Sequence, residues 1–211
     1  MNFLKKLFGK SAATREQKKK VLPVEYQIKM EMGEFSKSQL IKIQSDFILQ
    51  AGHFNSIGTA FRRTEEYDLA EKAYLQAIEL SPEYEDPYAN LLSLYILLKK
   101  YEQCELIYRR GMNHSAGSKS SIVYQDGRLH YIKGNYKMAF SAAQSCLTVE
   151  KFQDEFSFEL AIKSLLSLVK QEEEEEKNFE EAMKLWKFGM KIFPNSEQLK
   201  ELSKYFIDDE S

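Results

Sequence analysis

The sequence is poor in residues that break regular structure, with only 9 glycines and 4 prolines among 211 residues. An all-β fold needs many turns rich in these two residues, so their scarcity argues against one. Cysteine is also rare, since only Cys104 and Cys146 occur, and both lie in apolar surroundings. A disulfide framework or a zinc site needs more cysteines or closer spacing, so we expect two reduced, buried thiols.

Long apolar runs are missing as well. No run reaches the roughly eighteen residues that a membrane-spanning helix requires. The N-terminus lacks the apolar stretch of about seven residues that a secretory signal carries. From these two absences we expect a cytoplasmic protein.

The residue patterns of catalytic sites are absent too. The three histidines, His53, His114 and His130, form no two-histidine metal motif, and there is no glycine-rich phosphate loop or nucleophile elbow. We therefore expect no enzymatic activity, no bound metal and no cofactor.

Charge of both signs is present, and the net charge of −2 hides an asymmetry. Residues 1–20 carry a balance of +6, and the remaining residues carry −8. Nucleic-acid binding needs clustered positive charge, so the acidic body of the chain argues against it.

The main feature that the sequence does contain is an internal repeat with a period of about 34 residues. In its first unit, over 51–84, Gly58 and Ala70 are small where two antiparallel helices would approach closely. Pro82 follows the second helix, where a residue that cannot continue a helix is favoured. Large and small residues, apolar except for His130, recur in the same order in the next two units, over 85–118 and 120–153. These residues are Phe54, Ile57, Phe61, Tyr67, Tyr74, Ala77 and Ile78, then Tyr88, Leu91, Tyr95, Tyr101, Cys104, Tyr108, Gly111 and Met112, then Val123, Gly127, His130, Tyr136, Ala139, Cys146 and Leu147.

A fourth, irregular unit covers 154–195, and the ends of the array differ from the repeat. The fourth unit has a first helix near Phe156 to Gln171 and an acidic run, Glu172 to Glu176, that we expect to extend its turn. This run lacks the turn glycine of a calcium loop, so we expect no calcium site. Residues 21–50 are expected to be a linker and a leading helix from Ser38 to Gln50. Residues 196–211 are expected to form a solvating helix, Ser196 to Ile207, and a tail.

This pattern resembles the tetratricopeptide repeat family, and the resemblance covers residues 51–195. It implies an all-α fold, a right-handed superhelix of antiparallel helix hairpins. It also implies a non-catalytic scaffold or adaptor that binds a partner polypeptide in a concave groove lined by first helices. Some members grip heat-shock chaperone tails with a clamp of Lys, Asn, Asn, Lys and Arg. The corresponding residues here are Asn55, Thr59, Asn90, Ser121 and Gln125, of which only Asn90 matches, so we do not expect this clamp.

The residues expected to face the groove follow from their offset within each repeat. Their amides, hydroxyls and guanidinium groups suit an extended partner that carries acidic residues. The alternative is that they form ordinary solvated helix faces. The set is Asn55, Thr59, Arg62, Arg63, Ala89, Asn90, Ser93, Tyr124, Gln125, Arg128 and Tyr131.

The N-terminal segment is a second candidate site. If residues 1–10 form a helix, apolar side chains share one face and lysines border it. Such a helix can bind an anionic membrane surface, pack on a neighbouring helix or fray as a tail, and the three alternatives stay open. A peripheral membrane-associated assembly factor at the inner face of the membrane and a dedicated chaperone for a secreted or membrane client are therefore alternative functions. The oligomeric state also stays open. The membrane-facing residues would be Phe3, Leu4, Lys5, Lys6, Leu7 and Phe8.

Overall fold

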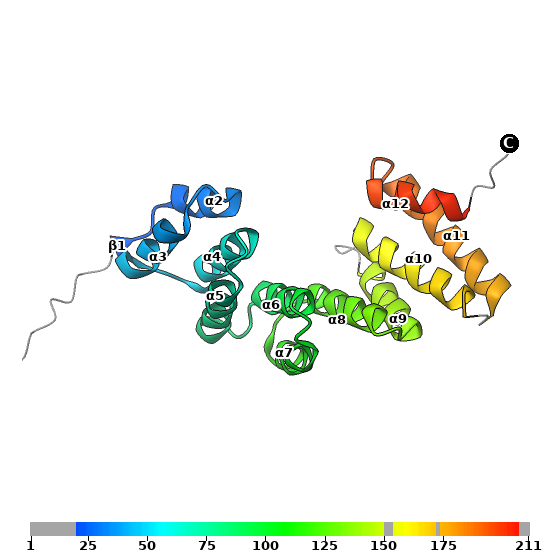
Figure 1. The fold of residues 1–211 in the computed structure, drawn as a ribbon, viewed down its shortest axis with the longest axis horizontal. Helices are drawn as coiled ribbons and strands as arrows, with labels where there is room; N and C mark the ends of the chain where they lie inside the picture. The colour runs from blue at the N-terminus through cyan, green and yellow to red at the C-terminus, as the bar shows by residue number, and fades with distance from the viewer. Residues whose placement is uncertain (1–19, 150–153, 172–173, 207–211) are drawn as a thin grey trace, which may run out of the picture.

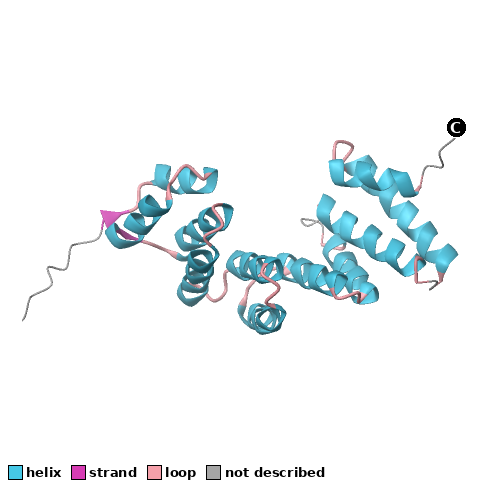
Figure 2. Ribbon diagram, in the orientation of Figure 1, coloured by secondary structure: helices cyan, strands magenta, loops and turns pink. Residues whose placement is uncertain are grey.

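The computed structural model describes residues 20–149, 154–171 and 174–206, which form a succession of α-helices with one short strand pair (Figures 1 and 2). The all-α fold class is thereby confirmed. The described ends of the chain lie at opposite ends of the array (Figure 1). In chain order the elements are β1 (Lys20–Val21), α2 (Val24–Met32), α3 (Lys37–Asp46), β2 (Phe47–Ile48), α4 (Ala51–Arg63), α5 (Tyr67–Leu80), α6 (Glu85–Leu97), α7 (Tyr101–His114), α8 (Ser120–Ile132), α9 (Tyr136–Leu147), α10 (Glu155–Val169), α11 (Glu175–Ile192), α12 (Glu197–Glu201) and the 3-10 helix η2 (Leu202–Tyr205).

Helices α4 and α5 form the first hairpin, and its small residues lie where the sequence predicts them. A Cβ atom on Gly58 would sit 2.6 Å from Cε1 of Tyr74, so only a glycine fits against this ring. Ala70 and Tyr74 are fully buried. The predicted close approach of the two helices is confirmed at Gly58, and Ala70 is buried as a core residue of the same hairpin.

The turn between the two helices of a hairpin has the same backbone conformation in three hairpins. Glu65, Lys99 and Gly134 each adopt a left-handed conformation between the two helices of a pair. In each turn the following residue donates its backbone N–H to a carbonyl of the first helix's last turn, the pattern of a Schellman motif. This shared geometry makes α4–α5, α6–α7 and α8–α9 copies of one structural unit.

The second hairpin departs from the first where a leucine replaces a glycine. Leu92 stands at the position of Gly58 and is buried, and α7 packs less closely on α6 than α5 does on α4. The close approach occurs instead at Gly111 of α7, where a Cβ would lie 2.8 Å from Cδ1 of Ile122 in α8. The same Cβ would lie 3.1 Å from Cγ of Tyr88 in α6, so α6, α7 and α8 meet closely at Gly111.

In the fourth hairpin, α10 packs against both α9 and α11. The acidic run contributes to the start of α11, because Glu175 and Glu176 lie in its first turn, where negative charge is favoured. Residues 172–173 lie outside the described part of the chain. Glu174 precedes the helix and forms an ion pair with Lys177 at 2.6 Å.

The C-terminal end is covered by α12 and η2, and not by the single helix expected from Ser196 to Ile207. The Trp186 indole of α11 donates a hydrogen bond to the Leu199 carbonyl at 2.8 Å, and its ring stacks on Phe206 with centroids 5.2 Å apart. These contacts hold the short terminal helices against α11.

The N-terminal end contains two features that the sequence analysis missed. Helix α2 lies within the expected linker and packs on α4. The leading helix ends at Asp46 and not at Gln50, because Phe47 and Ile48 pair in parallel with Lys20 and Val21. The Phe47 ring lies 5.6 Å from that of Tyr26. A strand whose partner is distant in the chain leaves no local periodic signal.

The buried apolar residues form separate clusters along the array. The largest extends from Leu22 to Leu129, another from Phe158 to Leu202, and a small third cluster contains Ala143, Leu160 and Ala161. From α4 onward, each helix packs on the next one or two helices in the chain, and α4 contacts α6, α6 contacts α8 and α8 contacts α10. Such packing places the first helices α4, α6, α8 and α10 in a continuous series.

Candidate functional site

Polar side chains on the first helices connect one hairpin to the next. Asn90 of α6 donates a hydrogen bond to Oδ1 of Asn55 in α4 at 2.9 Å. Arg62 of α4 and Arg128 of α8 both donate to the hydroxyl of Ser93 in α6, at 3.1 and 3.5 Å. We call the surface that carries these residues the first-helix face.

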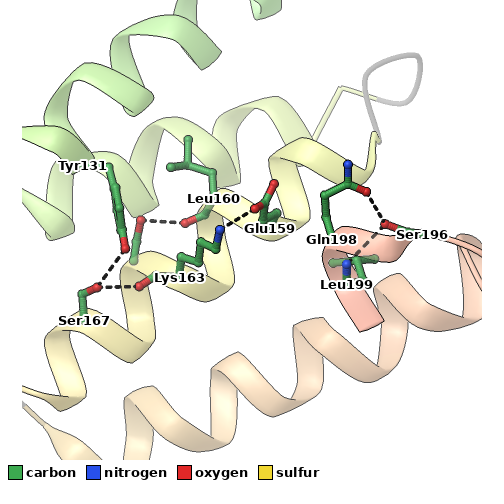
Figure 3. A network of polar contacts seen from close by, with 9 residues as sticks. Tyr131, Glu159, Leu160, Lys163, Ser167, Ser196, Gln198 and Leu199 are labelled. Carbon is green, nitrogen blue, oxygen red and sulfur yellow. Dashed lines mark hydrogen bonds and ion pairs between the residues drawn. The ribbon is translucent and has the colours of Figure 1, made fainter. Parts of the chain in front are cut away.

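The first-helix face continues onto the fourth hairpin. The hydroxyl groups of Tyr131 in α8 and Ser167 in α10 are 3.4 Å apart, and Figure 3 shows the tyrosine extending across to the serine. On the same stretch of α10, Lys163 forms an ion pair with Glu159. The sequence analysis named no residue of α10, because the acidic run interrupts the repeat there. The four-residue spacing of Glu159, Lys163 and Ser167 is the signal that identifies this face.

The other predicted groove residues differ in whether they lie on the first-helix face. Gln125 accepts a hydrogen bond from Arg128 at 2.7 Å and so belongs to the first-helix face. Thr59 donates to the Asn55 carbonyl and lies 3.3 Å from the Tyr74 hydroxyl, so it mainly joins α4 to α5. Ala89 is buried, and Arg63 lies near the turn at Gly33. The structure therefore brings most of the predicted residues together, but not these last two.

Arg62 and Arg128, which we call the arginine pair, are the main electrostatic feature of the face. Both side chains are half-buried and converge on one hydroxyl group. Among the residues that the structure describes, no Asp or Glu forms an ion pair with either. Two guanidinium groups beside one neutral acceptor form a site that favours a carboxylate, which could accept from both.

A hollow of about 230 Å³ lies between α8 and α10, beside Arg128. We call it the tyrosine pocket. Burial raises the pKa of Tyr124 to about 12, so its phenol stays neutral at physiological pH. The pocket is smaller than the roughly 300–1,000 Å³ of a typical small-molecule site, so its size suits one side chain. Its lining residues are Tyr124, Arg128, Tyr131, Ile132, Phe156, Glu159, Leu160 and Lys163.

Three further reactive side chains, the two thiols and His130, are buried or half-buried. Burial raises the pKa of both thiols, Cys104 and Cys146, to about 11, so neither is a thiolate at neutral pH. His130 is half-buried, with Nε2 3.6 Å from Asp126, and its buried Nδ1 has no hydrogen-bond partner in the described structure. No cluster of three or more His, Cys, Asp or Glu residues that could hold a metal occurs within the described ranges.

The N-terminal candidate site, Phe3 to Phe8, lies outside the described residues and stays a prediction. Across 20–149, 154–171 and 174–206, no helix combines the length and the apolar character needed to cross a membrane.

Comparison with known proteins agrees with the hairpin architecture. Residues 54–84, which span most of α4 and all of α5, match the tetratricopeptide repeat family. A search of curated proteins found no match to this chain. The hairpins α6–α7 and α8–α9 repeat the turn conformation of α4–α5. Residues 54–84 therefore form a tetratricopeptide repeat, and repeats of this family generally serve as scaffolds for protein–protein interaction.

Proposed function

We propose that this protein is a non-catalytic adaptor that binds an acidic segment of a partner polypeptide along the first-helix face. The arginine pair is the observation that supports this function. Two half-buried cations share Ser93, and no carboxylate of the described residues neutralises them. A partner carboxylate would supply the missing negative charge and form charge-assisted hydrogen bonds.

The form of the partner follows from how the polar groups are spread over the face. Amide, hydroxyl and guanidinium groups occur on α4, α6 and α8, and hydroxyl groups of α8 and α10 continue the series. An extended peptide presents backbone donors and acceptors along its length, so it can contact several successive helices. A compact small molecule would contact only one part of this series.

The proposal is tested by reversing the charge of the arginine pair. The partner is captured with the full-length chain, identified by mass spectrometry and purified. We expect the double variant Arg62→Glu with Arg128→Glu to raise its Kd by about a hundredfold, because each substitution replaces an attraction with a repulsion.

The matched control is Arg109→Glu with Lys184→Glu, which changes the net charge equally. Arg109 and Lys184 are exposed on the second helices α7 and α11, and each forms an ion pair with an acid four residues earlier, Glu105 and Glu180. This control should bind like the unaltered protein. Equal binding by both double variants would place the partner elsewhere and refute the function.

The basic N-terminal segment favours a second function, in which a peripheral protein assembles a complex at the inner face of the membrane. Residues 1–20 carry a balance of +6, and residues 3–8 would present an apolar face. Flotation with anionic liposomes, with and without residues 1–20, tests it. Loss of flotation on deletion would support tethering, and identical flotation would leave the cytoplasmic adaptor as the proposed function.

A further inference from the structure

We propose that the partner segment carries a bulky apolar side chain next to an Asp or Glu, with the apolar side chain in the tyrosine pocket and the carboxylate on the arginine pair. This inference rests on the proposed function and adds the chemistry of the partner. It assigns two adjoining subsites to one short peptide motif.

The two subsites adjoin because Arg128 belongs to both. Its guanidinium group donates to Ser93 beside Arg62, and the same side chain lines the tyrosine pocket. A residue that fills the pocket therefore places its neighbours in the peptide close to the arginine pair. The spacing between the apolar residue and the acid must accordingly be short.

The walls of the pocket include exposed apolar side chains that favour an apolar ligand group. Ile132 and Phe156 expose 50% and 45% of their surface, so an entering apolar side chain would remove this surface from water. The Tyr131 hydroxyl already lies beside that of Ser167. Three of the polar lining residues, Tyr131, Glu159 and Lys163, therefore already have polar partners within the protein.

The charges around the pocket favour an acidic residue in the peptide next to the apolar one. Lys163 and Glu159 line the pocket and neutralise each other as an ion pair. Arg128 is then the only uncompensated charge among the described lining residues. A carboxylate fits this site, and an acidic peptide is favoured over nucleic acid because the chain outside residues 1–20 carries −8.

Binding of synthetic peptides to the full-length protein tests the motif. The probes are capped, fluorescein-labelled peptides with one Phe and one Asp, which are adjacent or separated by one or two glycines and serines. Fluorescence anisotropy gives each Kd. We expect one spacing to bind best, and we expect replacement of its Phe by Ala or its Asp by Asn to weaken binding by about tenfold or more.

Variants of the protein test which subsite holds the Phe side chain of the peptide and which holds its Asp side chain. Phe156→Ala should weaken the Phe peptide but not its Ala version, and Arg128→Gln should weaken the Asp peptide but not its Asn version. Phe188→Ala is the matched control, since Phe188 is exposed to a similar extent, 51%, on α11 and does not line the pocket. It should bind every peptide like the unaltered protein.

Three results would overturn the motif. The first is equal binding of the Phe and Ala peptides, or no binding at any spacing. The second is a purified partner that depends on Arg62 and Arg128 but not on Phe156, which would leave the proposed function intact. The third concerns the chain's own residues 206–211, Phe-Ile-Asp-Asp-Glu-Ser, which have similar chemistry. If this peptide binds more tightly than all others and removal of 207–211 raises the affinity for them, the occupant is the chain itself.

Discussion

Gly58 faces the ring of Tyr74 across the α4–α5 contact, and Gly111 faces Ile122 across the α7–α8 contact. At both positions a methyl group in place of hydrogen would overlap an atom of the neighbouring helix. Because protein interiors are close-packed, such an overlap can be relieved only by moving the ring or the helix. Single hydrogens at these positions therefore determine how closely the helices approach.

Gly58→Ala should lower the free energy of unfolding by about 1–3 kcal/mol, because the added Cβ would lie 2.6 Å from Tyr74. The measurement is urea unfolding followed by circular dichroism. Gly52→Ala in the same helix is the control, since a Cβ there has no atom within 4 Å. Alanine is the better helix former, so the control should be neutral or stabilise by up to about 1 kcal/mol. Similar losses in both variants would contradict this account.

Among the helices, the start of α8 is stabilised by a residue of the preceding hairpin. The Glu85 carboxylate accepts hydrogen bonds from the backbone N–H groups of Lys119, at 3.1 Å, and Ser121, at 2.8 Å. Glu85 is itself the first residue of α6. One side chain thus satisfies free N–H groups of a later helix and joins two hairpins at their ends.

Removing this carboxylate should cost about 1–2 kcal/mol of stability, as expected for the loss of a helix cap. In Glu85→Ala the amide hydrogen of Ser121 should also exchange faster with solvent. The matched control is Glu102→Ala, which removes an exposed acid from the first turn of α7. It should lose no more than about 0.5 kcal/mol. Unchanged exchange at Ser121 would show that the cap contributes nothing.

The hairpins could be predicted from the sequence because each depends on local rules that recur. Small residues mark the helix contact and Pro82 marks the end of a unit, so a helix hairpin over residues 51–84 could be predicted from these residues alone. The end of α3 could not be predicted, because Phe47 and Ile48 pair with Lys20 and Val21, which are remote in sequence.

The candidate site was predictable for the regular units only. Offsets within the repeat place Asn55, Asn90 and Arg128 on one face, and the structure brings them together with Ser93. The α10 residues that complete the face were missed, because the irregular spacing of the fourth unit shifts them out of register. The convergence of Arg62 and Arg128 on one hydroxyl depends on how three helices pack, which no local pattern expresses.

Over the whole molecule, contacts run from each hairpin to its neighbours, and the core is divided along the array. Stability in such an array is approximately the sum of repeat and interface contributions. The two ends of the chain are therefore expected to respond separately to a local change. Trp186, the one tryptophan of the sequence, lies in the C-terminal cluster and reports on that end.

Gly58→Ala should consequently lower the urea midpoint seen by circular dichroism more than the midpoint seen by Trp186 fluorescence. The substitution lies in the cluster that extends from Leu22 to Leu129, whereas the indole contacts Leu199 and Phe206. If both probes shift equally after Gly58→Ala, the array unfolds as one cooperative unit and the division of the core has no energetic consequence.

The neighbour-only packing also bears on how the chain folds during its synthesis. At about 5–20 residues per second, a ribosome adds one unit of about 34 residues every 2–7 seconds. Helix formation and collapse take far less than a second. Helices α4 and α5 can therefore pair before α8 is translated, and each later hairpin emerges next to a hairpin whose apolar face it can cover. Released chains truncated after residue 84 and after residue 118 should show this order as stepwise protection from protease.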